Sequence, residues 1–424
     1  MCASAARGCF FTGSNPAVKA ASSFSNSASC PAERAATGLG GRLPRKEAVA
    51  PSGRSWAAAS KAGRLSSRQG RKRCFMAWRG RKKRACLRVL LRPFTRAMKL
   101  HHVLAALLVT ASAHGGSFTL EKTAAGGAIV KLDGQFFTEF VVDQANKTYL
   151  WPIIGPDGTD MTRSYPMKTV EGEQHDHPHH RGLCFGHENI GGYDTWAERS
   201  TFGEKPSDKT SARVSHLGAI KHRSITEMKD GEKAVLAVVA DHVDAAGKKI
   251  IEEIRRHTFM VKNGARIIDV DIELIATEGD TLVDDKKDAG LSIRVPSEMA
   301  VDKGKEGKGT GRIINSEGHT DGDAWAKRAT WVDYHGTVKG ASVGVAMLNH
   351  PSSFRHPTPW HVRTYGLFTA NPFGLQSLDK NSETGAFTLK KGEKITLRHR
   401  FIFHTGDEKA AKIAEAYADY AKEP

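Results

Sequence analysis

The densest group of chemically active side chains in the sequence is a run of histidines that begins at His175. Four histidines fall within six positions, and Arg181 follows them directly. If this segment is extended, His175, His177 and His179 point the same way. Two imidazoles separated by one residue are a common way to hold a metal ion. Because Pro178 disfavours a central strand, we expect the run to form a loop at the rim of a site.

Three interpretations of this run remain open. In the first, His175, His177 and His179 bind a divalent metal, which would be copper, iron or zinc. In the second there is no metal, Arg181 binds substrate, and His177, His179 or His180 acts as a general acid or base. In the third, the histidines are solvated side chains of a loop.

Two further candidates follow shortly after the run. His187 lies in a Gly-His-Glu-Asn segment, and Trp196 closes the segment Gly-Gly-Tyr-Asp-Thr-Trp. The glycines permit close backbone approach, and an indole offers a flat apolar surface that suits the C–H face of a sugar ring. We therefore place His187 and Trp196 among the substrate-binding candidates; the alternative for Trp196 is a position in the core.

A second polar cluster lies about 170 residues downstream. A strand that starts at Trp360 would place His361, Arg363 and Tyr365 on the face opposite Trp360 and Val362. Three large polar groups on one strand face are costly to bury unless they line a site, so we favour a pocket wall over a solvated face, with His361 as a further catalytic candidate and Arg363 and Tyr365 as substrate-binding candidates. The other substrate-binding candidates of this region are His350, His356, Trp360 as a stacking surface, and Asn371 in an Asn-Pro-Phe-Gly turn.

One arginine and one cysteine come from the chain between these clusters. Arg294 alternates with Ile293 and Val295, so it would face a site and bind an anion or a carboxylate, or else form a surface salt bridge. Cys184 is flanked by Leu183 and Phe185, which indicates a buried thiol rather than a nucleophile.

The elements that must position these residues are mostly strands. The expected strands are 128–132, 136–142, 234–240, 249–256, 266–274, 289–295, 343–348, 362–369 and 395–403. Asp133-Gly134 is a hairpin signal, and the charges at 252, 253, 255 and 256 are expected on a solvated face. One helix is expected, over 408–421. The pattern predicts an all-β fold, a large antiparallel sandwich or barrel with a short C-terminal helix.

The net charge of +17 suggests a nucleic-acid partner, but its distribution removes that suggestion. Residues 1–97 hold 21 Lys and Arg against only Glu33 and Glu47, and the rest of the chain is nearly neutral. Five of the six cysteines also lie in this leader, so the remaining chain must be held together by its core.

The junction after this leader has the layout of a secretory signal peptide. Met98-Lys99 precedes the apolar run 103–109, and Ala111-Ser112-Ala113 forms an A-x-A cleavage site. The apolar run is too short to cross a bilayer, which needs about 20 residues. We expect residues 98–113 to direct export to the periplasm or medium, and residues 114–424 to form one domain without a transmembrane segment. Residues 1–97 are then untranslated upstream sequence or a long disordered basic leader.

Several of these stretches resemble a family of exported bacterial proteins known as methane oxygenase PmoA-like. The resemblance rests on Asp-His-Pro-His-His-Arg-Gly-Leu at 176–183, His-Pro at 350–351, Trp-His-Val-Arg-x-Tyr-Gly at 360–366 and Asn-Pro-Phe-Gly at 371–374. It spans most of residues 118–405. Since this chain has no set of spanning helices, the resemblance implies a shared soluble β-sandwich of the galactose mutarotase-like type and a shared pocket, not methane oxidation.

Taken together, the two clusters predict an exported carbohydrate-active enzyme, a hydrolase, lyase or isomerase of a sugar or oligosaccharide. A metal-dependent copper or iron oxidoreductase that uses the same histidines is the first alternative, and a non-catalytic carbohydrate-binding protein is the second. No pair of carboxylates stands out as the acid and nucleophile of an ordinary glycosidase, which disfavours simple hydrolysis.

Overall fold

The computed structural model describes residues 116–424, and two eight-stranded antiparallel sheets dominate this part of the chain. The expected leader and signal peptide lie outside the described residues. The first sheet contains, in spatial order, β1 (Phe118–Lys122), β2 (Ala128–Leu132), β3 (Gln135–Val141), β4 (Tyr149–Ile153), β5 (Leu183–His187), β11 (Ala289–Arg294), β16 (Leu367–Ala370) and β15 (Trp360–Val362).

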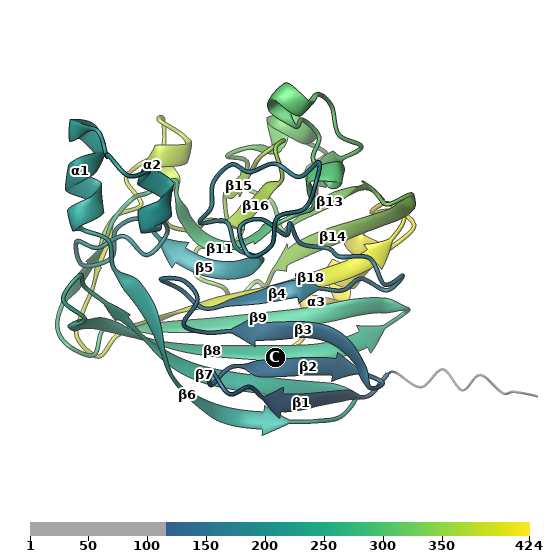
Figure 1. Cartoon of the computed structure of the whole chain (residues 1–424), viewed down its shortest axis with the longest axis horizontal. Coiled ribbons are helices and arrows are strands. Elements are labelled where there is room, and N and C mark those ends of the chain that lie inside the picture. Colours follow the sequence, from purple (N-terminus) through teal and green to yellow (C-terminus); the bar gives the residue numbers. More distant parts are fainter. Residues whose placement is uncertain (1–115) are drawn as a thin grey trace, which may run out of the picture. The chain divides into compact units, whose positions relative to one another are not determined.

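The second sheet packs against the first, so that β1 to β3 lie across β6 to β9 (Figure 1). In spatial order it contains β12 (Arg312–Asn315), β13 (Trp331–Val338), β14 (Ala341–Asn349), β18 (Lys394–Thr405), β9 (Ala265–Ile275), β8 (Lys249–Lys262), β7 (Lys233–Val243) and β6 (Ala219–Lys229). A small separate sheet pairs β10 (Thr281–Val283) with β17 (Phe387–Leu389).

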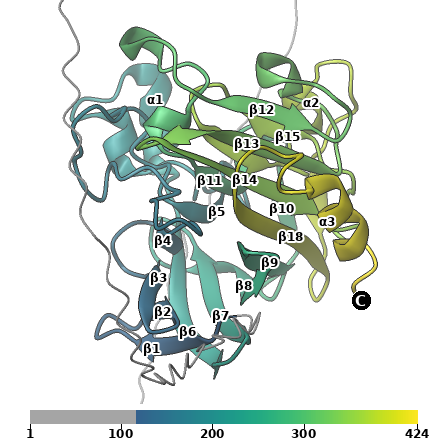
Figure 2. The ribbon, with the colours of Figure 1, turned by 90° about the vertical axis from the view of Figure 1, so that its right-hand side faces the viewer.

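The helices are short and lie outside the sandwich. They are α1 (Asp208–Ser215), α2 (Leu375–Leu378) and α3 (Ile413–Tyr420), with four short 3₁₀ turns between strands. α3 lies against β18 in Figure 2, where Ile413 and Tyr420 pack with Ile267, Leu348 and Ile402 on the outer face of the second sheet. Within residues 116–424 no helix is both long and apolar enough to cross a bilayer. The predicted antiparallel sandwich with a short C-terminal helix is confirmed.

Alternation along the strands decides which side chains enter the core between the sheets. On β11, Ala289, Leu291 and Ile293 belong to the main apolar cluster, so Ser292 and Arg294 point to the outer face. The same alternation decides which side chains of β5, β16 and β15 point to the outer face. The fold therefore gives the first sheet an outer face that carries polar side chains.

Two expectations about the strands are wrong. The single strand expected over 362–369 is two strands, β15 and β16, joined by a tight turn in which Gly366 has φ +101°. The charged stretch on β8 is not uniformly solvated, because Glu253 and Arg255 are buried between the sheets and form an ion pair at 2.5 Å. Strand alternation explains this result, since residues two apart share a face.

Candidate functional site

The floor of the candidate site is a row of outward side chains that crosses five strands of the first sheet. The strand register joins His361 to Thr369, Thr369 to Ser292, Ser292 to Cys184 and Cys184 to Tyr149. Neighbouring strands lie about 4.8 Å apart, so His361 lies about 10 Å from Ser292 across β16. The Thr369 hydroxyl is buried and has no hydrogen-bond partner among the described residues.

Arg294, the next outward residue on β11, is the hub of a buried polar network. It is 1% exposed, and its guanidinium donates to the Gln174 side-chain oxygen at 3.1 Å and to the Asp176 carboxylate at 2.8 Å. Arg163, also buried, donates to the same carboxylate oxygen at 2.6 Å. Burial alone would raise the pKa of Asp176, but the hydrogen bond with His177 and the two guanidiniums hold that pKa well below its usual range.

His180 has its protonation state fixed by Arg294. The guanidinium lies 3.1 Å from Nδ1 of His180. Because a guanidinium can only donate, Nδ1 must accept, and the neutral ring carries its proton on Nε2. Burial, with the positive charges of this region, lowers the pKa of His180 far below its ordinary value, so the ring is neutral at pH 7. His180 therefore offers an N–H donor.

His361 is fixed in the opposite tautomer. Its Nδ1 lies 2.7 Å from the backbone carbonyl oxygen of Lys287, which can only accept, so Nδ1 carries the proton and Nε2 carries a lone pair. Burial lowers the pKa of His361 to about 4, and the Asp288 carboxylate opposes this shift only in part. His361 is therefore a neutral ring whose Nε2 can accept a proton.

Aromatic rings and a cation form the exposed part of the site. His177, whose side chain is 43% exposed, lies parallel to His180 with centroids 4.9 Å apart and parallel to Tyr365 at 5.2 Å. The Arg294 and Arg363 guanidiniums lie 4.8 and 5.6 Å from the Tyr365 ring centroid. The three rings are thus stacked on one another beside charged groups, and His177 is the most exposed of them.

Three other predicted residues lie next to this surface but are held by protein partners. His179 shares a hydrogen bond of 3.0 Å with Thr201. Trp196 is buried, with its ring centroid 5.7 Å from that of His180. Arg181 donates to both oxygens of Glu198, at 2.8 and 2.9 Å. His179 and Arg181 thus help to fix the loop that carries the histidine run, and Trp196 packs behind His180.

The other side of the outer face is acidic. The Arg213 guanidinium lies 2.6 Å from Asp194, 3.6 Å from Glu188 and 4.0 Å from Asp288. A cavity of about 330 Å³ opens here, lined by Glu188, Asn189, Gly192, Asp194, Ala212, Arg213, His216 and Lys286. Burial raises the pKa of Glu188. A carboxyl group with a raised pKa in a cavity is a candidate proton donor.

Three predicted residues are placed in the core or in a turn. His187 points into the core, where burial lowers its pKa to about 3 and its Nδ1 accepts from the Asn189 N–H at 2.9 Å. Trp360 is fully buried and donates to the Ala329 carbonyl at 2.9 Å, so it cannot serve as a stacking surface. Asn371 is buried. Its side-chain oxygen accepts from the Gly374 N–H of its own turn, and its amide nitrogen donates to the Lys287 carbonyl that also holds His361.

Two more predicted residues contact the second sheet and the C-terminus. His350 packs its ring 5.0 Å from that of Tyr420 on α3 and contacts the Glu423 carbonyl oxygen at 3.0 Å. His356 donates to the Asn349 side-chain oxygen at 3.0 Å. These partners lie at the end of β14 and in the C-terminal segment. The structure therefore does not bring His350 and His356 to the histidine run.

The three histidines predicted as metal ligands are not gathered around one point. His175 stacks on Tyr165 with centroids 4.8 Å apart, whereas His177 stacks on Tyr365 and His179 faces Thr201. Within residues 116–424, the group of three such side chains that does converge consists of Asp333, His335 and Glu408, elsewhere in the fold.

Several residues that complete the site could not be recognised from the sequence. Arg163, Gln174, Ser292 and Thr369 carry no local pattern that marks them, because only the sheet register and loop packing bring them to Arg294 and His361. Asp194 and Arg213 form an ion pair at 2.6 Å, but their separation of 19 residues gives no periodic signal.

Solved structures share parts of this architecture at low similarity. They include the GH36 α-galactosidase AgaA from Geobacillus stearothermophilus (TM-score 0.33, 11% identity, 68% of this chain and 41% of that chain). A polysaccharide lyase has a TM-score of 0.28 and 12% identity over 70% of this chain and 34% of its own. A galactose mutarotase-like protein from Lactobacillus casei has a TM-score of 0.29 and 9% identity, over 68% of this chain and 100% of its own.

This chain spans less than half of the length of the α-galactosidase and of the lyase. No curated protein matches the chain in sequence. The model of a family of unknown function, DUF6807, matches residues 128–418, which include both sheets of the sandwich from β2 onward. The chain belongs to this family.

Proposed function

We propose that this protein is an exported carbohydrate-active enzyme that moves protons to and from a bound sugar on the outer face of the first sheet. The observation that carries the proposal is the pair of neutral histidines on this face, held in opposite tautomers. His361 has its lone pair on Nε2, and His180 has its proton on Nε2. An acceptor and a donor on one surface are what acid–base catalysis requires.

The chemistry follows from these two nitrogens. His361 Nε2 would take a proton from a hydroxyl or a C–H group of the sugar. His180 Nε2–H would donate a hydrogen bond to an oxygen that gains negative charge, and Glu188 is a further candidate to deliver a proton. This set favours isomerisation or elimination over ordinary hydrolysis, because Asp194, the carboxylate that shares the cavity with Glu188, is paired with Arg213 at 2.6 Å.

Two further features support a polar, ring-shaped substrate. The stacked rings of His177 and Tyr365 lie at the exposed side, where the half-exposed His177 ring could pack against a sugar ring. The Thr369 hydroxyl between His361 and Ser292 is a second polar group of this floor. It is enclosed and lacks a partner among residues 116–424, so a substrate hydroxyl would reach it only after neighbouring side chains move.

Export is the second part of the proposal. Its support is the sequence pattern at 98–113 alone, since these residues are not described by the structure. We expect the mature protein to begin at His114, directly after the Ala-Ser-Ala site. Amino-terminal sequencing of the protein recovered outside the cytoplasm checks this expectation, and an intact Met98-Lys99 segment on that protein would contradict it.

The test of the catalytic proposal uses a His361→Asn variant. The shorter amide can still donate to the Lys287 carbonyl, but it removes the Nε2 lone pair. We expect the wild-type protein to convert at least one member of a panel of aldoses, uronic acids and oligosaccharides, followed by proton NMR. In His361→Asn, kcat should fall roughly 10²- to 10⁴-fold, while the dissociation constant of the sugar changes little.

His319→Asn is the matched control, because His319 lies in the turn after β12 of the second sheet. It should leave turnover unchanged. Saccharide binding without any product in the wild type would identify a binding protein instead of an enzyme. Undiminished turnover in His361→Asn would place the reacting groups elsewhere.

A further inference from the structure

A second group of potential ligands lies on the outer face of the other sheet, independent of the proposed sugar site. Asp333 and His335 come from β13, and Glu408 comes from the segment that leads to α3. One ligand atom of each lies within 4.8 Å of the others. The separation is 2.6 Å between Asp333 Oδ1 and His335 Nδ1, and 3.8 Å between His335 Nδ1 and Glu408 Oε2.

The strand pattern explains why these side chains converge. Val332 and Tyr334 of β13 enter the core, so Asp333 and His335 share the outer face. In the register, His335 pairs with Gly344 of β14, and Gly344 pairs with His404 of β18. A Cβ atom at position 344 would lie 2.3 Å from the His404 ring. The missing side chain therefore leaves room for His404 to reach across β14.

His404 uses this room to contact the second oxygen of the same carboxylate. Its Nε2 lies 2.7 Å from Asp333 Oδ2, so the two oxygens of Asp333 are directed at two different histidines. Asp333 is fully buried, whereas the side chains of His335 and Glu408 are 15% and 12% exposed. The group is thus rigid at the sheet and open enough on the Glu408 side for an ion to enter.

We propose that Asp333, His335 and Glu408 bind a zinc ion. One imidazole nitrogen and two carboxylate oxygens are ligands that zinc accepts at about 2.0–2.2 Å, and a water molecule completes four-coordination in such three-residue sites. His404 is a positioning residue. It contacts the carboxylate oxygen of Asp333 that does not face His335, and so orients the carboxylate, as side chains behind metal ligands commonly do.

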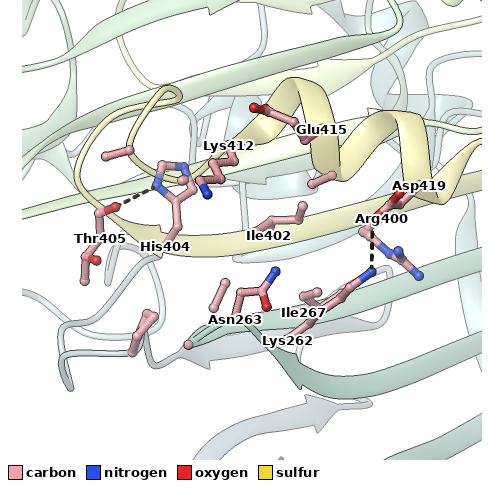
Figure 3. A pocket seen from close by; sticks show the side chains of 16 residues that line it. Lys262, Asn263, Ile267, Arg400, Ile402, His404, Thr405, Lys412, Glu415 and Asp419 are labelled. Atoms are coloured by element: carbon pink, nitrogen blue, oxygen red, sulfur yellow. Dashed lines mark hydrogen bonds and ion pairs between the residues drawn. The ribbon is translucent and has the colours of Figure 1, made fainter.

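The ion would join the C-terminal segment to the sheet beside a cavity. His404 lines a cavity of about 570 Å³ between the second sheet and the segment that runs into α3 (Figure 3). Lys412 lines it from that segment, and Ile402 and Thr405 of β18 and Asn263 of the β8–β9 turn line it from the sheet side. Zinc on Glu408 would fix the segment between Thr405 and Lys412 and so hold one wall of the cavity in place.

Calorimetric titration of the metal-stripped full chain with Zn²⁺ tests the proposal. We expect one zinc per chain at this site and at least a tenfold weaker affinity in Glu408→Gln, a nearly isosteric change at a partly exposed position. The same change should be seen in Asp333→Asn if that variant folds. His404→Gln should weaken zinc binding by roughly 10- to 100-fold, as for other outer-shell partners.

A His175→Ala/His177→Ala variant is the control, because these two histidines are exposed and could bind zinc on the part of the chain that the structure describes. It should retain the zinc site. Hydrogen exchange gives a second measurement, since zinc should slow exchange over residues 405–412 in the wild type but not in Glu408→Gln. No zinc uptake by the wild type, or uptake that depends on His175 and His177 but not on Glu408, overturns the proposal.

Discussion

At the scale of single residues, the candidate site depends on which nitrogen of each histidine carries the proton. In His361 the Lys287 carbonyl fixes the proton on Nδ1, and in His180 the Arg294 guanidinium forces Nδ1 to accept. Each tautomer follows from a partner that can play only one role in a hydrogen bond. Two rings with the same side chain thereby acquire opposite functions.

The lowered pKa of His361 predicts the acid limb of the pH–rate profile. The general base must be unprotonated, and burial lowers its pKa to about 4. Activity should therefore persist below pH 6.5, where an ordinary histidine becomes protonated, and fall as the pH approaches 4. The measurement is kcat/KM against pH on a converted sugar, with near-UV circular dichroism at each pH to confirm that the protein is folded. An acid limb centred near 6.5 would contradict this assignment.

The Asp176 carboxylate is predicted to stabilise the loop that carries the histidine run. Asp176→Asn leaves the buried guanidiniums of Arg163 and Arg294 without their shared counter-charge. Breaking such a pair from one side costs about 3 kcal/mol, and urea denaturation measures the change. Glu121→Gln, which removes an exposed ion pair with Lys131, is the control and should cost less than about 1 kcal/mol. Equal effects of the two changes would show that the network does not stabilise the fold.

At the scale of elements, the apolar pattern predicted ten of the eighteen strands among the described residues, with β15 and β16 taken as one. The expected strand 128–132 coincides with β2, and the clean alternation at 266–274 lies within β9. The helix expected over 408–421 is shorter, because α3 begins only at Ile413. β13 and β6 were not predicted; Asp333, His335 and many charged residues interrupt the apolar signal of these two strands.

The site could be predicted only in part for a related reason. Local clustering marked His177, His180 and Tyr365, which do come together. One partner of Asp176 is Arg294, 118 positions away, and the pairing of β11 with β5 brings the two segments together. His187 was predicted as a site residue only because it is polar. It lies in the core, since alternation along β5 puts it on the same face as the apolar residues of that strand.

Gly290 on β11 is predicted to be irreplaceable in the floor of the site. Its φ is +116°, and a Cβ atom would lie 2.0 Å from the Ala370 carbonyl oxygen. Gly290→Ala should lower the free energy of unfolding by about 3 kcal/mol or more, from strain and overlap together. Gly134→Ala has a similar positive φ of +75° but open space around it, so it should cost only about 1 kcal/mol. Chemical denaturation measures the free energy of unfolding of both variants. Similar losses in the two would contradict the prediction and would mean that β16 can move away from the new methyl group.

At the scale of the whole molecule, the sandwich buries an unusual set of neutral histidines. Burial lowers the pKa of His187, His257 and His399 to about 3, and all three are fully enclosed. Each ring binds its proton more readily in the unfolded chain, where its pKa is about 6.5. The unfolded state therefore takes up more protons below pH 6.5, and stability is lost as the pH falls from 6.5 toward 3.

The protein should therefore lose stability at pH values well above those at which carboxylates become protonated. Between pH 7 and pH 5, each of these histidines should reduce the free energy of unfolding by up to about 2 kcal/mol. Urea titrations at the two pH values measure the difference. His399→Gln should show a shallower pH dependence than the wild type, whereas stability that is the same at pH 7 and pH 5 would show that these rings are protonated in the folded state.

The measurement that tests the central claim most directly is ¹⁵N NMR of the histidine rings at pH 7. The structure predicts that His361 carries its proton on Nδ1 and His180 on Nε2, each assigned by loss of its signals in His361→Asn and His180→Asn. Addition of a converted sugar should shift the Nε2 resonance of both rings. If the two rings have the same tautomer, or if either is charged at pH 7, the site does not hold the acceptor and donor on which the proposed function depends.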